Sequence, residues 1–252
     1  MITGTYKLAG SVIRVDSLHP SVHTLCREYA SEETPDFGVT VTPGDIRAEA
    51  ERSARQDMPE DYLETMAVYR KIAEAMPSFG TLLFHGSAIC LDGEGYLFTA
   101  RSGTGKSTHT RLWREVFGDR AFMVNDDKPL LKVTAGGVLV CGTPWDGKHH
   151  LSTNTMVPLK AVCMLHRGKE NEIHPVSPAE ALPALLEQCY RPERTEAFLR
   201  TLTLLNTLSG TVAFYRMHCN MSAEAAAVAH AAMSAQHEPA VRKPDRVSDQ
   251  SR

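Results

Sequence analysis

Apolar residues recur along this chain with two different spacings, which divide it into predicted strands and helices. Short apolar or alternating runs predict strands over residues 5–8, 11–15, 38–42, 81–84, 88–91, 96–100, 121–125, 138–141, 159–166 and 211–215. Apolar residues three or four positions apart predict helices over residues 60–76, 106–117, 194–208 and 222–235. Another helix is expected to run to Tyr190 from a capping box made by Ser177 and Glu180, with Pro178 at its first position.

This order of elements predicts an α/β protein in two parts with a tail. Residues 1–78 are expected to form a β-rich module whose helix packs on the rest of the chain through Tyr62, Met66, Tyr69, Ala73 and Met76. The acid-rich stretch from residue 32 to residue 64 is expected to be a solvated face. Residues 79–236 are expected to form a larger domain around a mixed β-sheet, and the charged, proline-containing residues 237–252 a disordered tail.

The turn after the strand at 96–100 carries the most specific motif in the chain. Residues 100–108 match G-x-x-x-x-G-K-[ST] except at the first position, Ala100, and they have the strand before and helix after that this motif requires. The motif binds a nucleotide triphosphate: backbone amides surround phosphate oxygens, Lys106 balances their charge, and Ser107 can ligate Mg²⁺. The predicted phosphate-binding residues are Ser102, Gly103, Thr104, Gly105, Lys106, Ser107 and Thr108. The alternative is an ordinary glycine-rich turn.

Two further groups of polar residues follow strand ends near this motif. Asp126 and Asp127 come directly after the strand at 121–125, where one carboxylate can hold Mg²⁺ and the other can accept a proton from an attacking hydroxyl. The residues alone leave open which of the two takes which role, and a plain turn is the alternative. His85 follows the strand at 81–84, and a hairpin through residues 92–95 is expected to bring it beside the motif. It would move a proton or contact phosphate, or else be a structural histidine.

The loop at residues 143–148 has two open interpretations. Trp145 could line a pocket for a nucleotide base or an acceptor, with Lys148 contacting phosphate, or it could cap the core beneath an ordinary turn. The neighbouring His149 and His150 are expected to be a solvated pair, because successive residues of an extended chain point to opposite sides and do not easily share one metal ion.

Composition narrows the class of protein. The 252 residues are 42% hydrophobic and 23% charged, which is enough to build a real core. The formal net charge of −3 argues against a general nucleic-acid or acidic-membrane binder. Six widely spaced cysteines suggest neither a zinc site nor a disulfide framework, and no signal segment or membrane span is visible, so a cytoplasmic protein is expected.

Three segments together resemble the catalytic domain of the HPr kinase/phosphorylase family over roughly residues 80–135: Phe84-His-Gly-Ser-Ala, Thr99-Ala-Arg-Ser-Gly-Thr-Gly-Lys-Ser-Thr108 and Val124-Asn-Asp-Asp127. The resemblance implies the mixed-sheet P-loop fold that this family shares with phosphoenolpyruvate carboxykinases, and makes residues 79–236 a P-loop kinase domain. It implies ATP and Mg²⁺ as cofactors and Asp127, Lys106 and His85 as catalytic residues, with Asp127 as the general base. With that role taken, we assign Mg²⁺ to Ser107 and Asp126. The chain departs from the family at residues 139–148, where the family has a metal-binding Glu and an Arg-Gly-Leu-Gly run, and it lacks the family's usual N-terminal domain.

These features together predict an ATP-dependent kinase that transfers a γ-phosphoryl group to a hydroxyl, with serine in a peptide, protein or small molecule favoured. The expected partners are a nucleotide and this acceptor, without nucleic acid or membrane; a homo-oligomeric state stays open. Two alternatives remain: a phosphoenolpyruvate carboxykinase-like enzyme, and a non-catalytic nucleotide-binding regulatory protein.

Overall fold

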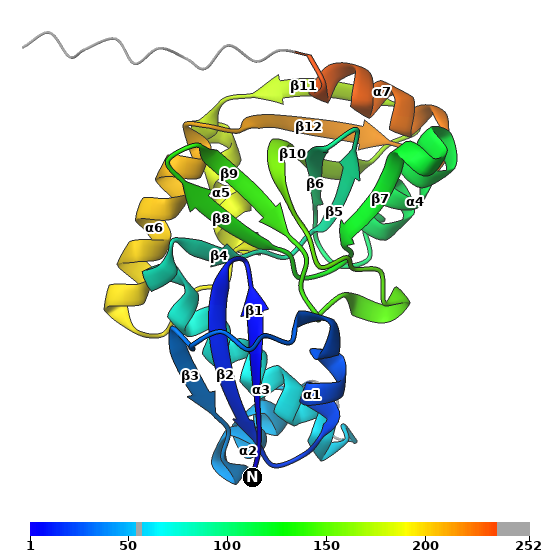
Figure 1. Ribbon diagram of the computed structural model, residues 1–252. Helices are drawn as coiled ribbons and strands as arrows, with labels where there is room; N and C mark the ends of the chain where they lie inside the picture. Colours follow the sequence, from blue (N-terminus) through cyan, green and yellow to red (C-terminus); the bar gives the residue numbers. More distant parts are fainter. Residues whose placement is uncertain (54–56, 236–252) are drawn as a thin grey trace, which may run out of the picture.

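The computed structural model describes residues 1–53 and 57–235, which form a small three-stranded sheet and a large, curled mixed sheet (Figure 1). The chain is therefore a mixed α/β protein, as the alternation of strands and helices predicted. The segment at 237–252, predicted to be disordered, lies outside the described residues.

The small sheet is built by the first 40 residues. Strand β1 (Ile2–Leu8) pairs antiparallel with β2 (Ser11–Ser17), and β3 (Phe37–Thr40) pairs with β2 in parallel. Ala9 and Gly10 make the two-residue turn of the hairpin, and both have positive φ angles, 50° and 79°, as the tightest hairpin turns require. Three helices accompany this sheet: α1 (Ser21–Leu25), α2 (Pro43–Arg52) and α3 (Glu60–Ala75).

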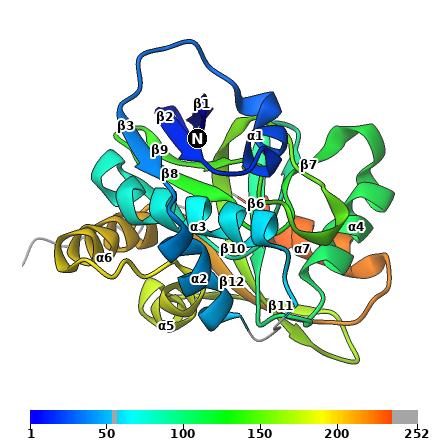
Figure 2. The same ribbon diagram turned by 90° about the horizontal axis from the view of Figure 1, so that it is seen from below.

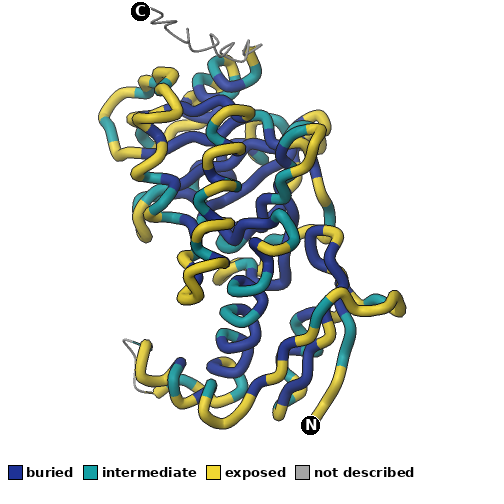
Figure 3. The backbone as a smooth tube through the Cα atoms, turned by 90° about the vertical axis from the view of Figure 1, so that its left-hand side faces the viewer, coloured by how far each residue is buried: buried dark blue, intermediate teal, exposed yellow. Residues whose placement is uncertain are grey.

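Helix α3 lies between the small sheet and the large one (Figures 2 and 3). Tyr69, Ala73 and Met76 of the predicted apolar stripe are buried, and Met66 packs against the same core. Tyr62, in the first turn, is exposed, so the stripe begins one turn later than predicted. That core joins residues of β1, β2 and α3 to residues of the large sheet, and the helix therefore links the two sheets.

The acid-rich stretch contains two buried carboxylates, and the prediction of a solvated face is wrong at both. Glu64 is fully buried and accepts backbone N–H groups from Leu18 and His19 at 2.6 and 2.8 Å. Glu49 is buried against Arg70, to which it makes two hydrogen bonds. Both carboxylates have partners far away in sequence, although Glu49 also accepts a hydrogen bond from Arg52 three residues on. Local charge composition does not reveal the distant partners.

The large sheet has the strand order β4-β8-β9-β10-β6-β5-β7, with β12 beside β10 and β11 beside β12. Its strands are β4 (Thr81–Leu83), β5 (Ser87–Leu91), β6 (Glu94–Thr99), β7 (Ala121–Asn125), β8 (Leu130–Thr134), β9 (Gly137–Cys141), β10 (Met156–Arg167), β11 (Glu172–Val176) and β12 (Ala213–Cys219). The long strand β10 pairs antiparallel with β9 at its start and in parallel with β6 and β12 further on. Because one strand serves both halves, the sheet curls around it.

Two pairs of helices cover opposite faces of this sheet. Helices α4 (Lys106–Phe117) and α7 (Glu224–Met233) pack together over one face, and α5 (Pro178–Gln188) and α6 (Thr195–Ser209) pack over the other (Figure 1). Side chains alternate between the two cores along β6: Tyr96 and Phe98 face α4, whereas Leu97 faces the side of α5 and α6. None of the helices in the described residues is long and apolar enough to cross a membrane.

Four elements were not predicted: α1, α2, β8 and β11. Helix α2 had a visible signal, since Thr42 and Asp45 form a capping box around Pro43. Strand β11 is largely exposed at the border of the sheet, so no apolar pattern marks it. Strand β8 follows directly on the turn that begins at Asp126, and its five residues offer too short a pattern to separate from that turn.

Candidate active site

The three predicted groups of site residues lie together at one end of strands β5, β6 and β7 of the large sheet. Strand β5 runs antiparallel to both of its neighbours, β6 and β7, so its amino end lies beside their carboxyl ends. This end of the three strands opens into a cleft of about 460 Å³. The cleft is lined by His85, Ser102, Gly103, Gly105, Lys106, Ser107, Thr108, Asp126, Asp127, Gly147, Lys148 and His149. Every predicted site residue is on this wall except Thr104, which faces two neighbouring cavities.

The phosphate-binding motif forms the loop between β6 and α4. Gly103 and Gly105 have φ angles of 78° and 123°, a region that favours glycine, so these two positions allow the tight turn. Ala100 is not among the residues with positive φ, and its methyl group is therefore compatible with the loop. Its carbonyl accepts a hydrogen bond from Lys106 Nζ at 3.0 Å. Burial lowers the pKa of Lys106, and the carboxylates of Asp127 and Asp126 oppose that shift.

Asp126 is held in place by a chain of two hydroxyl groups, of which Ser87 contacts it directly. It is 6% exposed, and its Oδ1 accepts a hydrogen bond from Ser87 Oγ at 2.6 Å. Ser87 Oγ in turn lies 2.9 Å from Thr110 Oγ1, and all three side chains are buried. Since the Ser87 hydrogen is donated to the carboxylate, Thr110 is the donor in the second contact. Asp126 is thereby held in a defined position against the first turns of α4.

Asp127 stands between two basic side chains. Its Oδ1 lies 3.5 Å from His85 Nε2 and 3.7 Å from Lys128 Nζ. Burial and, after it, the positive charges of Lys128 and Lys106 together lower the pKa of His85 to about 4 against the opposing effect of Asp127, so the ring is neutral at pH 7. Asp127 therefore lines the cleft with a neutral ring and an ammonium group beside its carboxylate.

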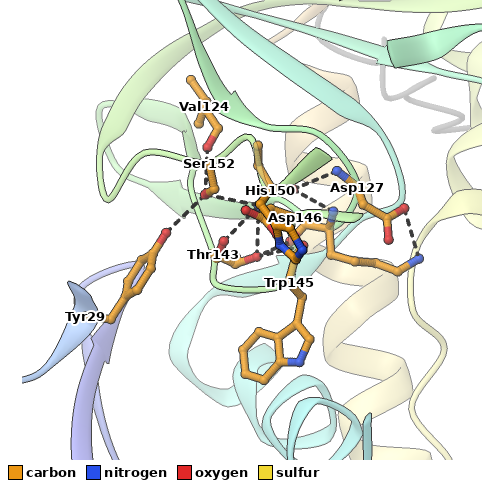
Figure 4. A network of polar contacts seen from close by, with 10 residues as sticks. Tyr29, Val124, Asp127, Thr143, Trp145, Asp146, His150 and Ser152 are labelled. Atoms are coloured by element: carbon orange, nitrogen blue, oxygen red, sulfur yellow. Dashed lines mark hydrogen bonds and ion pairs between the residues drawn. The ribbon is translucent and has the colours of Figure 1, made fainter. Parts of the chain in front are cut away.

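Asn125 organises the backbone that presents both aspartates. This fully buried side chain accepts the N–H groups of Asp127 and Lys128 at Oδ1, at 2.9 and 2.6 Å. Its Nδ2 donates to Thr143, at 3.0 Å to the carbonyl and 3.1 Å to the hydroxyl. The network continues through Ser152 to Tyr29 of the N-terminal module (Figure 4). One amide therefore connects the aspartate turn to the loop at residues 143–148.

That loop has its tryptophan in the core. Trp145 is 8% exposed, its Nε1 donates to Thr65 O of α3 at 3.2 Å, and its ring lies 5.2 Å from that of Tyr69. Of the two open interpretations, the structure has the one in which Trp145 caps the core. Lys148, by contrast, does line the cleft. His149 and His150 are both exposed, as predicted for a solvated pair.

Gly147 brings the same loop close to Asp127. It has a φ angle of 76°, and a Cβ placed there would lie 3.1 Å from Asp127 Cβ. A side chain at this position would be strained by its backbone conformation and would press on the aspartate. The glycine therefore allows the loop to close over one side of the cleft.

Sequence reasoning assigned no role to Ser87, Thr110 or Asn125. Asn125 had a recognisable signal, because an asparagine before a turn commonly bonds the backbone two residues later. Ser87 and Thr110 had none, since their contacts depend on how α4 packs on β5. We found no group of three or more His, Cys, Asp or Glu side chains able to hold a metal ion in residues 1–53 and 57–235.

The donors at the cleft nevertheless fit Mg²⁺. Ser107 and Asp126 supply a hydroxyl and a carboxylate oxygen on the same wall. Mg²⁺ prefers oxygen ligands, and with a bound nucleotide it commonly uses one or two carboxylates together with phosphate oxygens and water. If a magnesium ion binds here together with a phosphate chain, Ser107 and Asp126 are the residues that would supply its protein oxygens.

Comparison with known proteins gives a family but no described activity. No curated protein matches the chain. Among solved structures, the HPr(Ser) kinase/phosphatase from Coxiella burnetii is similar at 14% sequence identity, with a TM-score of 0.29, covering 49% of this chain and 93% of that one. A similarity at this score does not establish a shared fold. A family model described as "SynChlorMet cassette protein ScmC" matches residues 51–227, more than half of the chain. The chain therefore belongs to the ScmC family of SynChlorMet cassette proteins.

Proposed function

We propose that this protein is an ATP-dependent kinase that transfers the γ-phosphoryl group to a hydroxyl, with serine in a peptide, protein or small molecule as the favoured acceptor. One observation carries the proposal: Lys106 and Ser107 share a single cleft with Asp126 and Asp127. A phosphate cradle, oxygen ligands for a cation and a carboxylate base are the parts that phosphoryl transfer to a hydroxyl requires.

The loop and the first turn of α4 bind the triphosphate. The amides of residues 102–107 surround phosphate oxygens at the positive end of the helix dipole. Lys106 exchanges its bond to Ala100 O for the β and γ phosphates, whose negative charge supports its protonated form. Mg²⁺ bound by Ser107 and Asp126 would neutralise charge on the β and γ phosphate oxygens. Lys148 lines the same cleft and adds a further positive charge.

Asp127 accepts the proton of the acceptor hydroxyl as the hydroxyl oxygen bonds to the γ phosphorus, while the bond from that phosphorus to the β–γ bridging oxygen breaks and ADP leaves. The neutral His85 ring and the Lys128 ammonium group lie beside this carboxylate and position it. Asn125 Oδ1 accepts the N–H of Asp127, and this hydrogen bond fixes the position of Asp127 relative to the end of β7.

We also propose that the large sheet has the P-loop fold of HPr kinases and phosphoenolpyruvate carboxykinases, and that the protein is cytoplasmic. The arrangement of β5, the phosphate-binding motif and β7 around one cleft supports the proposed fold. A non-catalytic nucleotide-binding regulator is the second candidate. Among the described residues that line the cleft, Asp126 and the proposed base Asp127 are the only carboxylates, so a single carboxylate is left to bind the metal.

The test is incubation with γ-labelled ATP, Mg²⁺ and three separate pools: free serine, a serine-containing peptide and oxaloacetate. We expect an acid-stable phosphoester on a hydroxyl, absent from the Asp127→Asn variant. Asp119→Asn, at an exposed carboxylate outside the cleft, is the matched control and should keep the activity. Labelled phosphoenolpyruvate as the only product would instead identify a carboxykinase. Tight ATP binding with no labelled product in any pool would identify the regulator.

A further inference from the structure

A second cavity lies directly beside the phosphate-binding loop. It encloses about 470 Å³ and is lined by Gly103, Thr104, Gly105, Thr108, His109, Leu112, Leu165, His166, Arg167, Gly168, Cys219, Asn220 and Met221. It shares Gly103, Gly105 and Thr108 with the active-site cleft. The two hollows therefore meet across the loop, and a phosphate chain lying over these three residues extends from one into the other.

The wall of this cavity has the mixed character of a small-molecule site. Leu112 and Leu165 supply buried apolar side chains from α4 and β10, and Met221 is exposed at its edge. The rings of His109 and His166 and the Arg167 guanidinium add flat or polar surface. Pockets for ligands of this kind usually combine an apolar lining with a few polar groups, in volumes of roughly 300–1,000 Å³.

His109 contributes a buried ring to the wall of the cavity. Its side chain is 2% exposed, and its Nε2 accepts the Trp113 indole N–H at 3.1 Å. Because Nε2 accepts this hydrogen bond, His109 faces the cavity as a ring fixed by Trp113. Its other nitrogen, Nδ1, is buried and has no partner among the described residues, so the ring contributes a flat surface to the wall and not a hydrogen-bond donor.

Arg167 stands at the border between the cavity and the loop. Its Nη2 donates to Gly103 O at 2.6 Å, which places a guanidinium group on the tip of the phosphate-binding loop. A positive charge here favours the negatively charged α and β phosphates that would cross from the cleft. A third cavity, of about 670 Å³, also adjoins the loop through Thr104, but it shares no lining residue with the cleft.

We infer that the cavity beside Gly103, Gly105 and Thr108 holds the nucleoside part of the phosphoryl donor, which is consequently a nucleoside triphosphate and not an inorganic polyphosphate. The inference rests on the proposed function, because it takes the triphosphate to lie on the loop. The apolar wall contacts the faces of the base, the phosphates pass Arg167 and Thr108, and the γ phosphate reaches the cleft of Asp126 and Asp127.

Cys219 provides a direct reporter of this cavity. It lines the wall and is partly exposed, whereas the other five cysteines are buried. Burial raises the pKa of Cys219, so alkylation with iodoacetamide is best followed at mildly alkaline pH. At an ATP concentration about ten times its Kd, the site is roughly 90% occupied, and alkylation should slow about tenfold. Inorganic triphosphate, which lacks a nucleoside, should bind without slowing it. Mass spectrometry should locate the alkyl label on Cys219, and the Cys219→Ser variant should not be labelled there.

The outcomes separate the two proposals. If calorimetry shows that ATP and triphosphate both bind and neither protects Cys219, or both protect it equally, the nucleoside lies elsewhere while the phosphate site stands. If neither compound binds, the proposed function fails and this inference fails with it. Protection by ATP alone supports both.

A substitution provides a second measurement. Met221→Ala removes an exposed apolar side chain from the edge of the cavity, and we expect ATP to bind roughly three- to tenfold more weakly, with triphosphate affinity unchanged. Met156→Ala, at another exposed methionine outside the cavity, is the matched control and should leave both affinities unchanged. Equal effects of the two variants on ATP would contradict the inference.

Discussion

Ser87 donates its hydroxyl hydrogen to Asp126 across 2.6 Å, inside a wholly buried contact that joins β5 to the end of β7. Thr110 extends the contact to α4 by donating its hydroxyl hydrogen to Ser87 Oγ. Asp126, a proposed ligand of Mg²⁺, is therefore held against the helix that carries Ser107 by hydroxyl groups that are not themselves proposed ligands.

Removing the Ser87 hydroxyl should consequently weaken metal binding. In Ser87→Ala, we expect the Mg²⁺ concentration for half-maximal activity to rise about 10- to 100-fold, the range typical of residues that orient metal ligands. At saturating Mg²⁺, turnover should largely recover. A magnesium titration of activity measures this, with Ser209→Ala on α6 as the control at a serine remote from β5 and α4. An unchanged Mg²⁺ requirement would show that the contact does not position the ligand.

Lys106 should determine nucleotide affinity. Lys106→Ala removes the positive charge proposed to balance the β and γ phosphates, so Mg-ATP binding should weaken strongly or turnover should be lost. Calorimetry measures binding, and circular dichroism checks that the fold is retained. Lys7→Ala, at an exposed lysine of β1, should behave as wild type. Equal ATP affinity and turnover in wild type and Lys106→Ala would refute the phosphate-binding assignment.

The two aspartates should respond differently to amide substitution. Asp127→Asn should still bind ATP but lose transfer by about 10²–10⁴-fold, the contribution of a general base. Asp126→Asn should be partly rescued by more Mg²⁺ or by Mn²⁺, because it loses a metal ligand. Steady-state rates across a metal titration distinguish the two. Metal rescue of Asp127→Asn alone would mean that the roles are reversed.

Acid should destabilise the protein through its buried neutral histidines. Burial lowers the pKa of both His85 and His109 from 6.5 to about 4, so between these values the unfolded chain binds more protons than the folded one. The free energy of unfolding should accordingly increase as the pH is raised from 4 to 6.5, and acidification over the same range should lower it. Urea denaturation at several pH values measures it. His85→Gln, which cannot titrate, should reduce the slope in that window, and an unaltered slope would contradict the assignment.

The parts of the site that follow from local sequence were predictable, and the parts that follow from packing were not. Lys106 and Ser107 lie where their motif places them, because a short loop between a strand and a helix leaves the backbone little choice. Asp126 and Asp127 follow from the end of one strand. The support from Ser87 requires α4 to pack on β5, a relationship that spacing along the chain does not contain.

The position of Trp145 also depends on packing that the local sequence does not contain. Its loop composition allowed either a ligand wall or a core position, and only the arrival of α3, 80 residues away in sequence, decides between them. Glu49 and Glu64 were misjudged for a related reason, since their partners come from distant segments. The division at residue 78, between the N-terminal module and the larger domain, stays a prediction.

The contact between Trp145 and α3 bears on any attempt to dissect the molecule. A fragment beginning at residue 79 would lack Thr65 and Tyr69, which now cover the indole ring. Its exposed aromatic surface would favour self-association, and such a fragment should be poorly soluble. A fragment intended for biophysical work should therefore begin upstream of α3, and it should keep β1 and β2, because their buried side chains share one core with that helix.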